Sequence, residues 1–341
     1  MTTSLLIHRA GPAMTVQDLG RPGHMGQGLS MGGAADRTAF IEGVALLGQS
    51  LSCAAIEMAA FGGEFSTTAD IRIALTGAPM KATLDGELLV WNASHLVKAG
   101  QNLSIGPART GVYGYLHVGG GIHTPPFLGS RATHLAAGIG GVLASNQTLP
   151  IGPDSHPGIA GKTLTPEARF EGGSVRVLPS VQTHNFPGVV RTRFEKTGFK
   201  RTPRGNRQGV ELDFDGLPFA TGEQLTILSE PMVAGDIQMT GEGIPFVLLP
   251  ECQTTGGYPR IGTVLPCDLP IVAQATAGSA LSFRFVGHGT ALQTHKSPEQ
   301  ILAQLTTSTR PLVRDPRAVR DLLAYQLVGG VVNALEGDRM E

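Results

Sequence analysis

A polar segment at residues 251–260 carries the groups best suited to binding a small molecule. It reads Glu-Cys-Gln-Thr-Thr-Gly-Gly-Tyr-Pro-Arg and lies between two short apolar runs, residues 244–249 and 261–265, which are typical of strands. The Gly256-Gly257 pair lets backbone N–H groups turn toward a ligand without a Cβ in the way. The segment is therefore either a binding loop or a β-hairpin loop whose Thr and Gln side chains satisfy its own backbone. The residue types leave both interpretations open.

A second set of candidates consists of charged residues in glycine-rich, otherwise apolar surroundings. They are Asp18, Arg21, Glu57 and Arg131. Isolated charges in such positions are usually paired inside the protein. The alternative is a polar pocket for a small carboxylate or urea-like substrate, with Arg21 and Arg131 binding the carboxylate.

Three other motifs are weaker. Gly28-Leu29-Ser30-Met31-Gly32 matches the G-x-S-x-G nucleophile elbow, but glycines rather than a strand precede the serine, so a nucleophile is not predicted. Residues 161–163 (GKT) lack the first glycine of a P-loop, and the Met-Lys pair at 80–81 is expected in an ordinary strand rather than a biotin-acceptor hairpin. The histidines and cysteines show no metal-ligand spacing, so no metal is predicted.

Composition favours a β-rich protein. The 341 residues include Gly 47 and Pro 23 but only 16% charged residues, which indicates many turns between short strands. A formal net charge of −1 gives no reason to expect nucleic acid or an anionic membrane as a partner. Three cysteines without a CxxC pair, and no leader or long apolar span, lead us to expect a cytoplasmic protein.

Short strands and a few helices are expected along the chain. Asp36 and Gly48 are predicted to cap a helix between them, Asp85-Gly86 a hairpin turn, and Ser297-Pro298 the start of a helix, followed by another from Asp315. A proline- and glycine-rich stretch, residues 150–166, is the candidate domain boundary. The expected strands cover residues 5–9, 71–75, 84–91, 103–105, 112–118, 174–178, 209–212, 225–228, 245–249, 261–265 and 281–285, and one more is expected to begin at Ile56.

Several longer motifs, in the same order along the chain, resemble the carboxyltransferase-like family that contains allophanate hydrolase subunit 2 and the C-type subunit of 5-oxoprolinase. This family also contains the Kip inhibitor antagonist and part of the carboxyltransferase region of urea carboxylase. The matching stretches are residues 15–23 (TVQDLGRPG), 32–36 (GGAAD), 56–58 (IEM), 74–78 (ALTGA), 128–133 (LGSRAT), 235–238 (GDIQ), 253–259 (QTTGGYP) and 268–270 (DLP). Glu251 stands where this family usually has aspartate.

The resemblance implies two linked β-barrel modules, at least one of them cyclophilin-like. Together with the residue patterns above, it leads us to expect a mainly β fold with a few short helices and a helical C-terminus. We place the modules at residues 1–160 and 161–341. The resemblance also implies site residues. The expected catalytic residues are Gln253, Thr254, Thr255 and Tyr258, and the residues expected to bind substrate are Asp18, Arg21, Asp36, Gly256 and Gly257. The isolated charges described above add Glu57 and Arg131 to the substrate-binding set.

The resemblance further implies a subunit of an ATP-dependent amide or lactam hydrolase of the 5-oxoprolinase type. Its expected partners are a subunit 1 protein (KipI/PxpB-like) and a LamB/YcsF-like third subunit. ATP would be consumed by the complex, at a site that the sequence does not locate. One alternative is a carboxyltransferase component that uses biotin carried by another protein. Another is a regulatory protein that sequesters its subunit 1 partner without chemistry.

Overall fold

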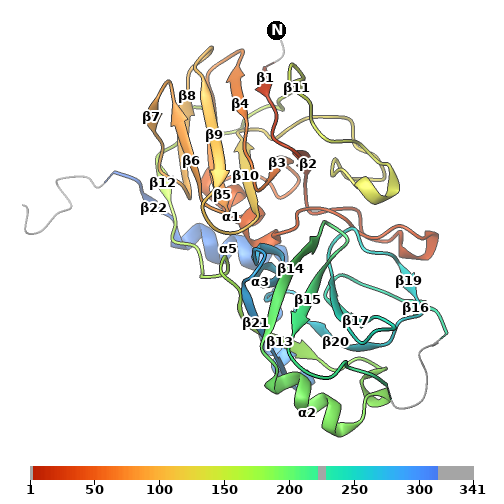
Figure 1. The fold of residues 1–341 in the computed structure, drawn as a ribbon. Helices are drawn as coiled ribbons and strands as arrows, with labels where there is room; N and C mark the ends of the chain where they lie inside the picture. The colour runs from red at the N-terminus through yellow and green to blue at the C-terminus, as the bar shows by residue number, and fades with distance from the viewer. Residues whose placement is uncertain (1–2, 222–227, 314–341) are drawn as a thin grey trace, which may run out of the picture.

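The computed structural model describes residues 3–221 and 228–313, which form two β modules with short helices packed between and around them (Figure 1). The prediction of a mainly β fold with few helices is confirmed.

The first module packs two sheets face to face. One has the strand order β11-β1-β4-β9-β6-β7 and the other β2-β3-β10-β5-β8-β12-β22. Alternating apolar side chains from both sheets, among them Ile7, Phe65, Ile56 and Leu116, fill one core between them. The strands are β1 (Ser4–Arg9), β2 (Thr15–Gln17), β3 (Ala55–Ala59), β4 (Glu64–Thr67), β5 (Ile71–Gly77), β6 (Met80–Leu84), β7 (Glu87–Leu88), β8 (Ala93–Val97), β9 (Leu103–Ala108), β10 (Tyr113–Val118), β11 (Thr148–Pro150), β12 (Lys162–Thr163) and β22 (Arg310–Pro311).

The second module is a closed barrel with the strand order β13-β20-β17-β18-β15-β14-β21. Phenylalanine rings fill its interior; Phe194 on α2 packs against Phe199 and Phe283. The strands are β13 (Gly173–Leu178), β14 (Phe199–Gly205), β15 (Gly209–Phe214), β17 (Asp236–Met239), β18 (Pro245–Leu248), β20 (Arg260–Val264) and β21 (Ala280–Phe285), with a separate pair formed by β16 (Glu230–Pro231) and β19 (Thr255–Gly256).

Two helices, α1 and α5, begin at the capping residues that the sequence predicts. The Asp36 side chain accepts a hydrogen bond from the Ala39 N–H at the start of α1, and Gly48 ends that helix in the left-handed region. Ser297 and Gln300 form the complete capping box of α5. The helices are α1 (Arg37–Leu47), α2 (Gly188–Lys196), α3 (Leu269–Gln274), α4 (His288–Thr294) and α5 (Pro298–Ser308), with 3-10 turns η1 (Met25–Gln27), η2 (Leu135–Ala137) and η3 (Thr183–Asn185). No helix in the described ranges is long and apolar enough to cross a bilayer.

Most predicted strands are present, with one error and two positions outside the described residues. The strand expected at residues 84–91 is wrong because Asp85 and Gly86, both with positive φ, form the predicted turn between β6 and β7, and β8 begins only at Ala93. Most of the strand expected at 225–228 and the helix expected from Asp315 lie outside the described residues. The chain passes between the modules after β12, and β22 returns to pair with β12.

The polar segment at 251–260 is not a hairpin loop. Strand β17 lies between β18 and β20 in the barrel, so the chain crosses the end of β17 to connect them. On the way, Thr255 and Gly256 pair with Pro231 and Glu230. The hairpin alternative is therefore wrong, and the segment is a loop anchored to a second loop.

Candidate functional site

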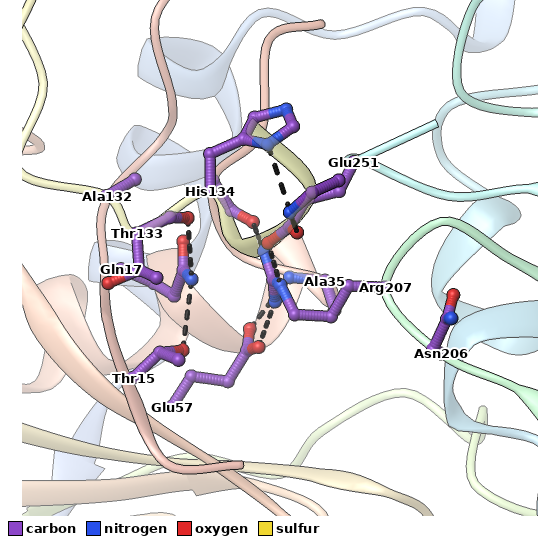
Figure 2. A network of polar contacts seen from close by, with 12 residues as sticks. Thr15, Gln17, Ala35, Glu57, Ala132, Thr133, His134, Asn206, Arg207 and Glu251 are labelled. Carbon is purple, nitrogen blue, oxygen red and sulfur yellow. Dashed lines mark hydrogen bonds and ion pairs between the residues drawn. The ribbon is translucent and has the colours of Figure 1, made fainter. Parts of the chain in front are cut away.

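The two modules meet at a buried ion cluster centred on Arg207. This arginine lies in the turn between β14 and β15 and reaches across to the first module, where its Nη1 donates to Glu57 on β3. Its Nε donates to Glu251 Oε1 at 2.5 Å, and its Nη2 to the Gly33 carbonyl oxygen at 2.5 Å. Figure 2 shows Arg207 between the two carboxylates, with His134 beyond Glu251. Arg207, Glu57 and Glu251 are all buried. Each charge therefore needs its partners of opposite charge to offset the cost of its removal from water.

Glu57 is fully occupied within this cluster. Its Oε2 accepts hydrogen bonds from the Ala35 N–H at 2.8 Å and from the Tyr115 hydroxyl at 2.7 Å. Burial raises the pKa of Tyr115 well above its ordinary value, and the Glu57 charge adds to that effect, so the phenol stays a donor. Glu57 therefore pairs with Arg207 rather than with Arg21 or Arg131.

Asp18 joins the first glycine-rich loop to the loop around residue 130. Its carboxylate accepts from the Ser130 hydroxyl at 2.6 Å, from the Arg131 backbone N–H at 2.7 Å and from the Gly20 N–H at 2.7 Å. The Arg131 guanidinium instead donates to the Thr124 carbonyl oxygen at 2.8 Å. Asp18 thus holds the loops, and the Arg131 side chain is engaged elsewhere.

Arg21 carries an unused hydrogen-bond donor in the protein interior. The side chain is 1% exposed; its Nη2 donates to the Ala132 carbonyl oxygen and its Nε to that of Phe127 at 3.4 Å, but Nη1 has no hydrogen-bond partner among the described residues. Burial lowers the pKa of Arg21, although the Asp18 and Glu251 charges partly oppose this. A buried guanidinium nitrogen without an acceptor is costly, which makes it a candidate ligand contact.

The open Nη1 of Arg21 lies beside His134 and the 30–32 loop. A Cβ placed on Gly32 would be 3.6 Å from Arg21 Nη1 and 3.1 Å from His134 Cδ2. His134 Nε2 and Ser30 Oγ are 2.8 Å apart, while Glu251 Oε2 is 3.9 Å from His134 Nδ1. Burial lowers the pKa of His134, opposed by Glu251. Four polar side chains, Arg21, Ser30, His134 and Glu251, thus converge where the modules meet.

The 253–258 loop begins at this cluster and is held by polar contacts from the barrel. Gln253 Nε2 donates to Gln238 Oε1 at 2.9 Å, and Gly256 lies against the Gln238 amide, where a Cβ would come within 2.8 Å of its nitrogen. The Thr254 side chain is buried, whereas those of Thr255 and Tyr258 are exposed to solvent. Of the four residues predicted to be catalytic, Gln253, Thr255 and Tyr258 are therefore exposed, and Thr254 is not.

Asp36 belongs to a different buried cluster. Its carboxylate caps α1 and also accepts from Arg169 Nε at 2.7 Å and from Gln274 Nε2 at 2.9 Å. Arg169 Nη2 donates to Glu42 on α1 at 2.7 Å. With its acceptor oxygens used inside the protein, Asp36 holds the modules together rather than lining the Arg21 cluster.

Sequence reasoning missed Arg207 and His134. Neither residue lies in one of the matching motifs. Arg207 and its partner Glu57 are more than a hundred residues apart in sequence, and His134 and Glu251 lie in different modules. An arginine in a Gly-Asn-Arg-Gln-Gly turn, residues 205–209, was the one available signal. In residues 3–221 and 228–313, no group of three or more His, Cys, Asp and Glu side chains is placed to hold a metal.

Comparison with known proteins shows the family. Residues 27–285 match the family described as carboxyltransferase domain, subdomain A and B. The chain is 34% identical to the C-type subunit of 5-oxoprolinase from Escherichia coli (strain K12) over 306 residues, covering 88% of this chain and 97% of that protein.

Two solved structures are similar over most of the chain. The structure of TTHA0988 superposes with a TM-score of 0.76 at 30% identity, covering 83% of this chain and 56% of its own. Kluyveromyces lactis urea carboxylase gives a TM-score of 0.81 at 22% identity, covering 92% of this chain but only 31% of that one, so this likeness concerns the fold.

Proposed function

Because this chain belongs to the family of the carboxyltransferase domain, subdomains A and B, we propose that it is the C-type subunit of a 5-oxoprolinase. The complex would hydrolyse the ring amide of 5-oxoproline to glutamate at the expense of ATP. The observation that carries the proposal is the 34% identity to a C-type 5-oxoprolinase subunit across 97% of that protein's length. The buried cluster around Arg21 offers a site of matching chemistry.

Arg21 supplies the group that such a substrate requires. 5-Oxoproline carries one carboxylate, and the unpartnered Nη1 of Arg21 would donate a charge-assisted hydrogen bond to it. The buried surroundings strengthen this bond because little water competes for either charge. Asp18 acts indirectly, since it holds together the loops that carry Arg21 and Ala132.

The 253–258 loop would polarise the ring carbonyl. The Thr255 hydroxyl and the backbone around Gly256 and Gly257 provide donors on a loop fixed by the Gln253–Gln238 hydrogen bond. One donor aimed at a developing oxyanion contributes about 3 kcal/mol to lowering a barrier. The exposed Tyr258 lies in the same loop and would contact the substrate or a partner subunit.

ATP and the partner subunits complete the proposal. The chain has no recognisable phosphate-binding loop, so phosphate handling would be shared with a subunit 1 protein (KipI/PxpB-like) and a LamB/YcsF-like subunit. These partners are expected from the family resemblance.

The test is co-expression of this chain with its genomic neighbours and an assay of glutamate release from 5-oxoproline and ATP. Release that requires all subunits is expected. Arg21→Ala and Thr255→Ala should each abolish most of it while the variant chains still co-purify with their partners. A tight complex without turnover would instead favour a regulatory binding protein.

Carboxyl transfer is the second candidate, favoured by the family description and by the fold shared with urea carboxylase. It requires a biotinylated carrier protein. Retention of the complex on avidin, together with biotin-dependent ATP turnover and no glutamate release, would replace the oxoprolinase proposal with this one.

A further inference from the structure

Ser30, His134 and Glu251 look like a nucleophilic triad but are not connected like one. A serine nucleophile needs a histidine whose unprotonated Nε2 accepts the hydroxyl proton and whose Nδ1–H is held by a carboxylate. Ser30 Oγ lies 2.8 Å from His134 Nε2, as such a triad would require. The hydrogen bonds at the other ring nitrogen, Nδ1, decide whether His134 accepts a hydrogen bond from Ser30 or donates one to it.

His134 Nδ1 is an acceptor in this structure. The Ala137 backbone N–H, which can only donate, is shared between His134 Nδ1 and the His134 carbonyl oxygen, both at 3.2 Å, and makes His134 the N-cap of η2. A neutral imidazole whose Nδ1 accepts carries its proton on Nε2. In this tautomer His134 donates to Ser30 and cannot take a proton from it.

Glu251 does not compensate for this arrangement. At 3.9 Å its Oε2 is beyond hydrogen-bond distance of Nδ1, and it accepts instead from the Ala136 N–H at 3.1 Å. The other oxygen is bound by Arg207 Nε. Burial also keeps His134 neutral by lowering its pKa. Both carboxylate oxygens are thus committed away from the imidazole.

The Ser30 hydroxyl hydrogen is consequently free to donate. Within the described residues His134 is the hydrogen-bond partner of Ser30 Oγ. In this contact the serine oxygen only accepts, so its own hydrogen has no acceptor. The unpartnered Arg21 Nη1 and the His134 ring both face Gly32, where a Cβ would lie 3.6 Å from Nη1 and 3.1 Å from His134 Cδ2. The Ser30–His134 pair therefore lies close to the open donor of Arg21. We propose that Ser30 is the second donor, beside Arg21, to the carboxylate of the substrate, and that His134 acts as a positioning residue that keeps the serine in its donor state.

This inference rests on the proposed function and distinguishes binding from nucleophilic catalysis. In the reconstituted complex, Ser30→Ala should raise KM for 5-oxoproline about 10- to 100-fold, as expected for one hydrogen bond to a charged group, and change kcat little. His134→Gln keeps an N–H donor toward Ser30 and should retain a KM near wild type, whereas His134→Ala should resemble Ser30→Ala. A loss of kcat of about a thousandfold in both Ser30→Ala and His134→Gln would overturn the inference, because it marks a nucleophile and its base.

The first module provides a matched control. His8 Nε2 and Ser66 Oγ are 2.7 Å apart on the exposed surface formed by β1 and β4. Ser66→Ala and His8→Gln change the same residue types in the same pairing, and both should leave KM and kcat unchanged. Equal effects of the two serine substitutions would contradict a specific role for Ser30.

Two measurements on the full chain separate failure of this inference from failure of the proposed function. Nitrogen-15 NMR, with His134 assigned through His134→Gln, should show the Nε2–H tautomer, and a fluorophosphonate probe should leave Ser30 unlabelled. An Nδ1–H tautomer or labelled Ser30 overturns the inference whether or not the complex hydrolyses 5-oxoproline. An Nε2–H tautomer with an inactive wild-type complex removes the proposed function and supports the donor state of Ser30.

Discussion

Two buried arginines hold the modules together through nearly the same set of contacts. Arg169 and Arg207 each donate to two carboxylates and one carbonyl oxygen. Tyr115 connects the clusters: its hydroxyl accepts from the Asp36 N–H and donates to Glu57. The two clusters therefore form one continuous polar network between the modules, centred on Arg169 and on Arg207.

The surroundings of the two centres differ. In the Arg169 cluster, Gln274 completes the hydrogen bonding. Its side-chain nitrogen donates to Asp36 and to the Tyr113 carbonyl oxygen, and its side-chain oxygen accepts from two backbone N–H groups. Beside Arg207 lie Arg21, with an open Nη1, and the Ser30–His134 pair. A closed network stabilises the fold, whereas donors left open at a similar depth indicate binding. We therefore interpret the Arg169 cluster as structural and the surroundings of Arg207 as the candidate binding site.

The largest effect is expected from Arg207→Leu. This substitution leaves Glu57 and Glu251 buried without their cation, so the free energy of unfolding should fall by about 3–5 kcal/mol. Urea denaturation of the full chain measures it. Adding Glu57→Gln and Glu251→Gln to the same variant should recover much of the loss. A decrease below about 1 kcal/mol in the single variant would show that the cluster is hydrated rather than buried.

Arg21→Gln should instead act mainly on activity. The amide cannot replace a charged donor to the substrate carboxylate, so kcat/KM of the reconstituted complex should fall at least about 100-fold. The unfolding free energy should fall less than in Arg207→Leu, because Arg21 has no carboxylate partner of its own among the described residues. If stability falls as far as in Arg207→Leu with kcat/KM preserved, Arg21 is structural.

Glu42 in the Arg169 cluster should make stability depend on pH. Burial raises its pKa from 4.5 to about 7, with Arg169 opposing the shift. Between these values the folded chain holds a proton that the unfolded chain has lost, so stability falls as pH rises through this window, by about 1–3 kcal/mol. Thermal unfolding of wild type and Glu42→Gln should be measured from pH 5 to pH 8. The difference in stability between the two proteins should narrow or change sign as the pH rises. Parallel curves would contradict the prediction.

The smallest effect is expected from Arg169→Lys. A lysine keeps the charge but loses the fork that contacts Asp36 and Glu42 together, which should cost about 1–2 kcal/mol of stability. Activity of the folded complex should stay within about twofold. The matched variant Arg21→Lys should lower kcat/KM with little change in stability. If the two lysine variants behave alike in the activity assay, the distinction between the two clusters does not hold.

The sequence determined the features whose physical cause is local. The cap at Asp36, the left-handed end at Gly48, the Asp85-Gly86 turn and the capping box at Ser297 each depend on contacts within about four residues, so their types and spacing suffice. The mainly β character follows from short apolar runs between turn residues. The family motifs also located the loops that carry Asp18, Arg21 and Thr255.

Only the tertiary structure decided what those loops contact. Glu57 and Arg207 are 150 positions apart in sequence, and Ser30 and His134 are 104 apart, so no local pattern encodes their pairing. Strand order, not residue type, made the 251–260 segment a crossing loop, because β17 lies between β18 and β20. The charged candidates then separated by partner: Asp36 and Glu57 entered closed ion pairs, while Arg21 kept a donor free because the described part of the fold brought no acceptor to it.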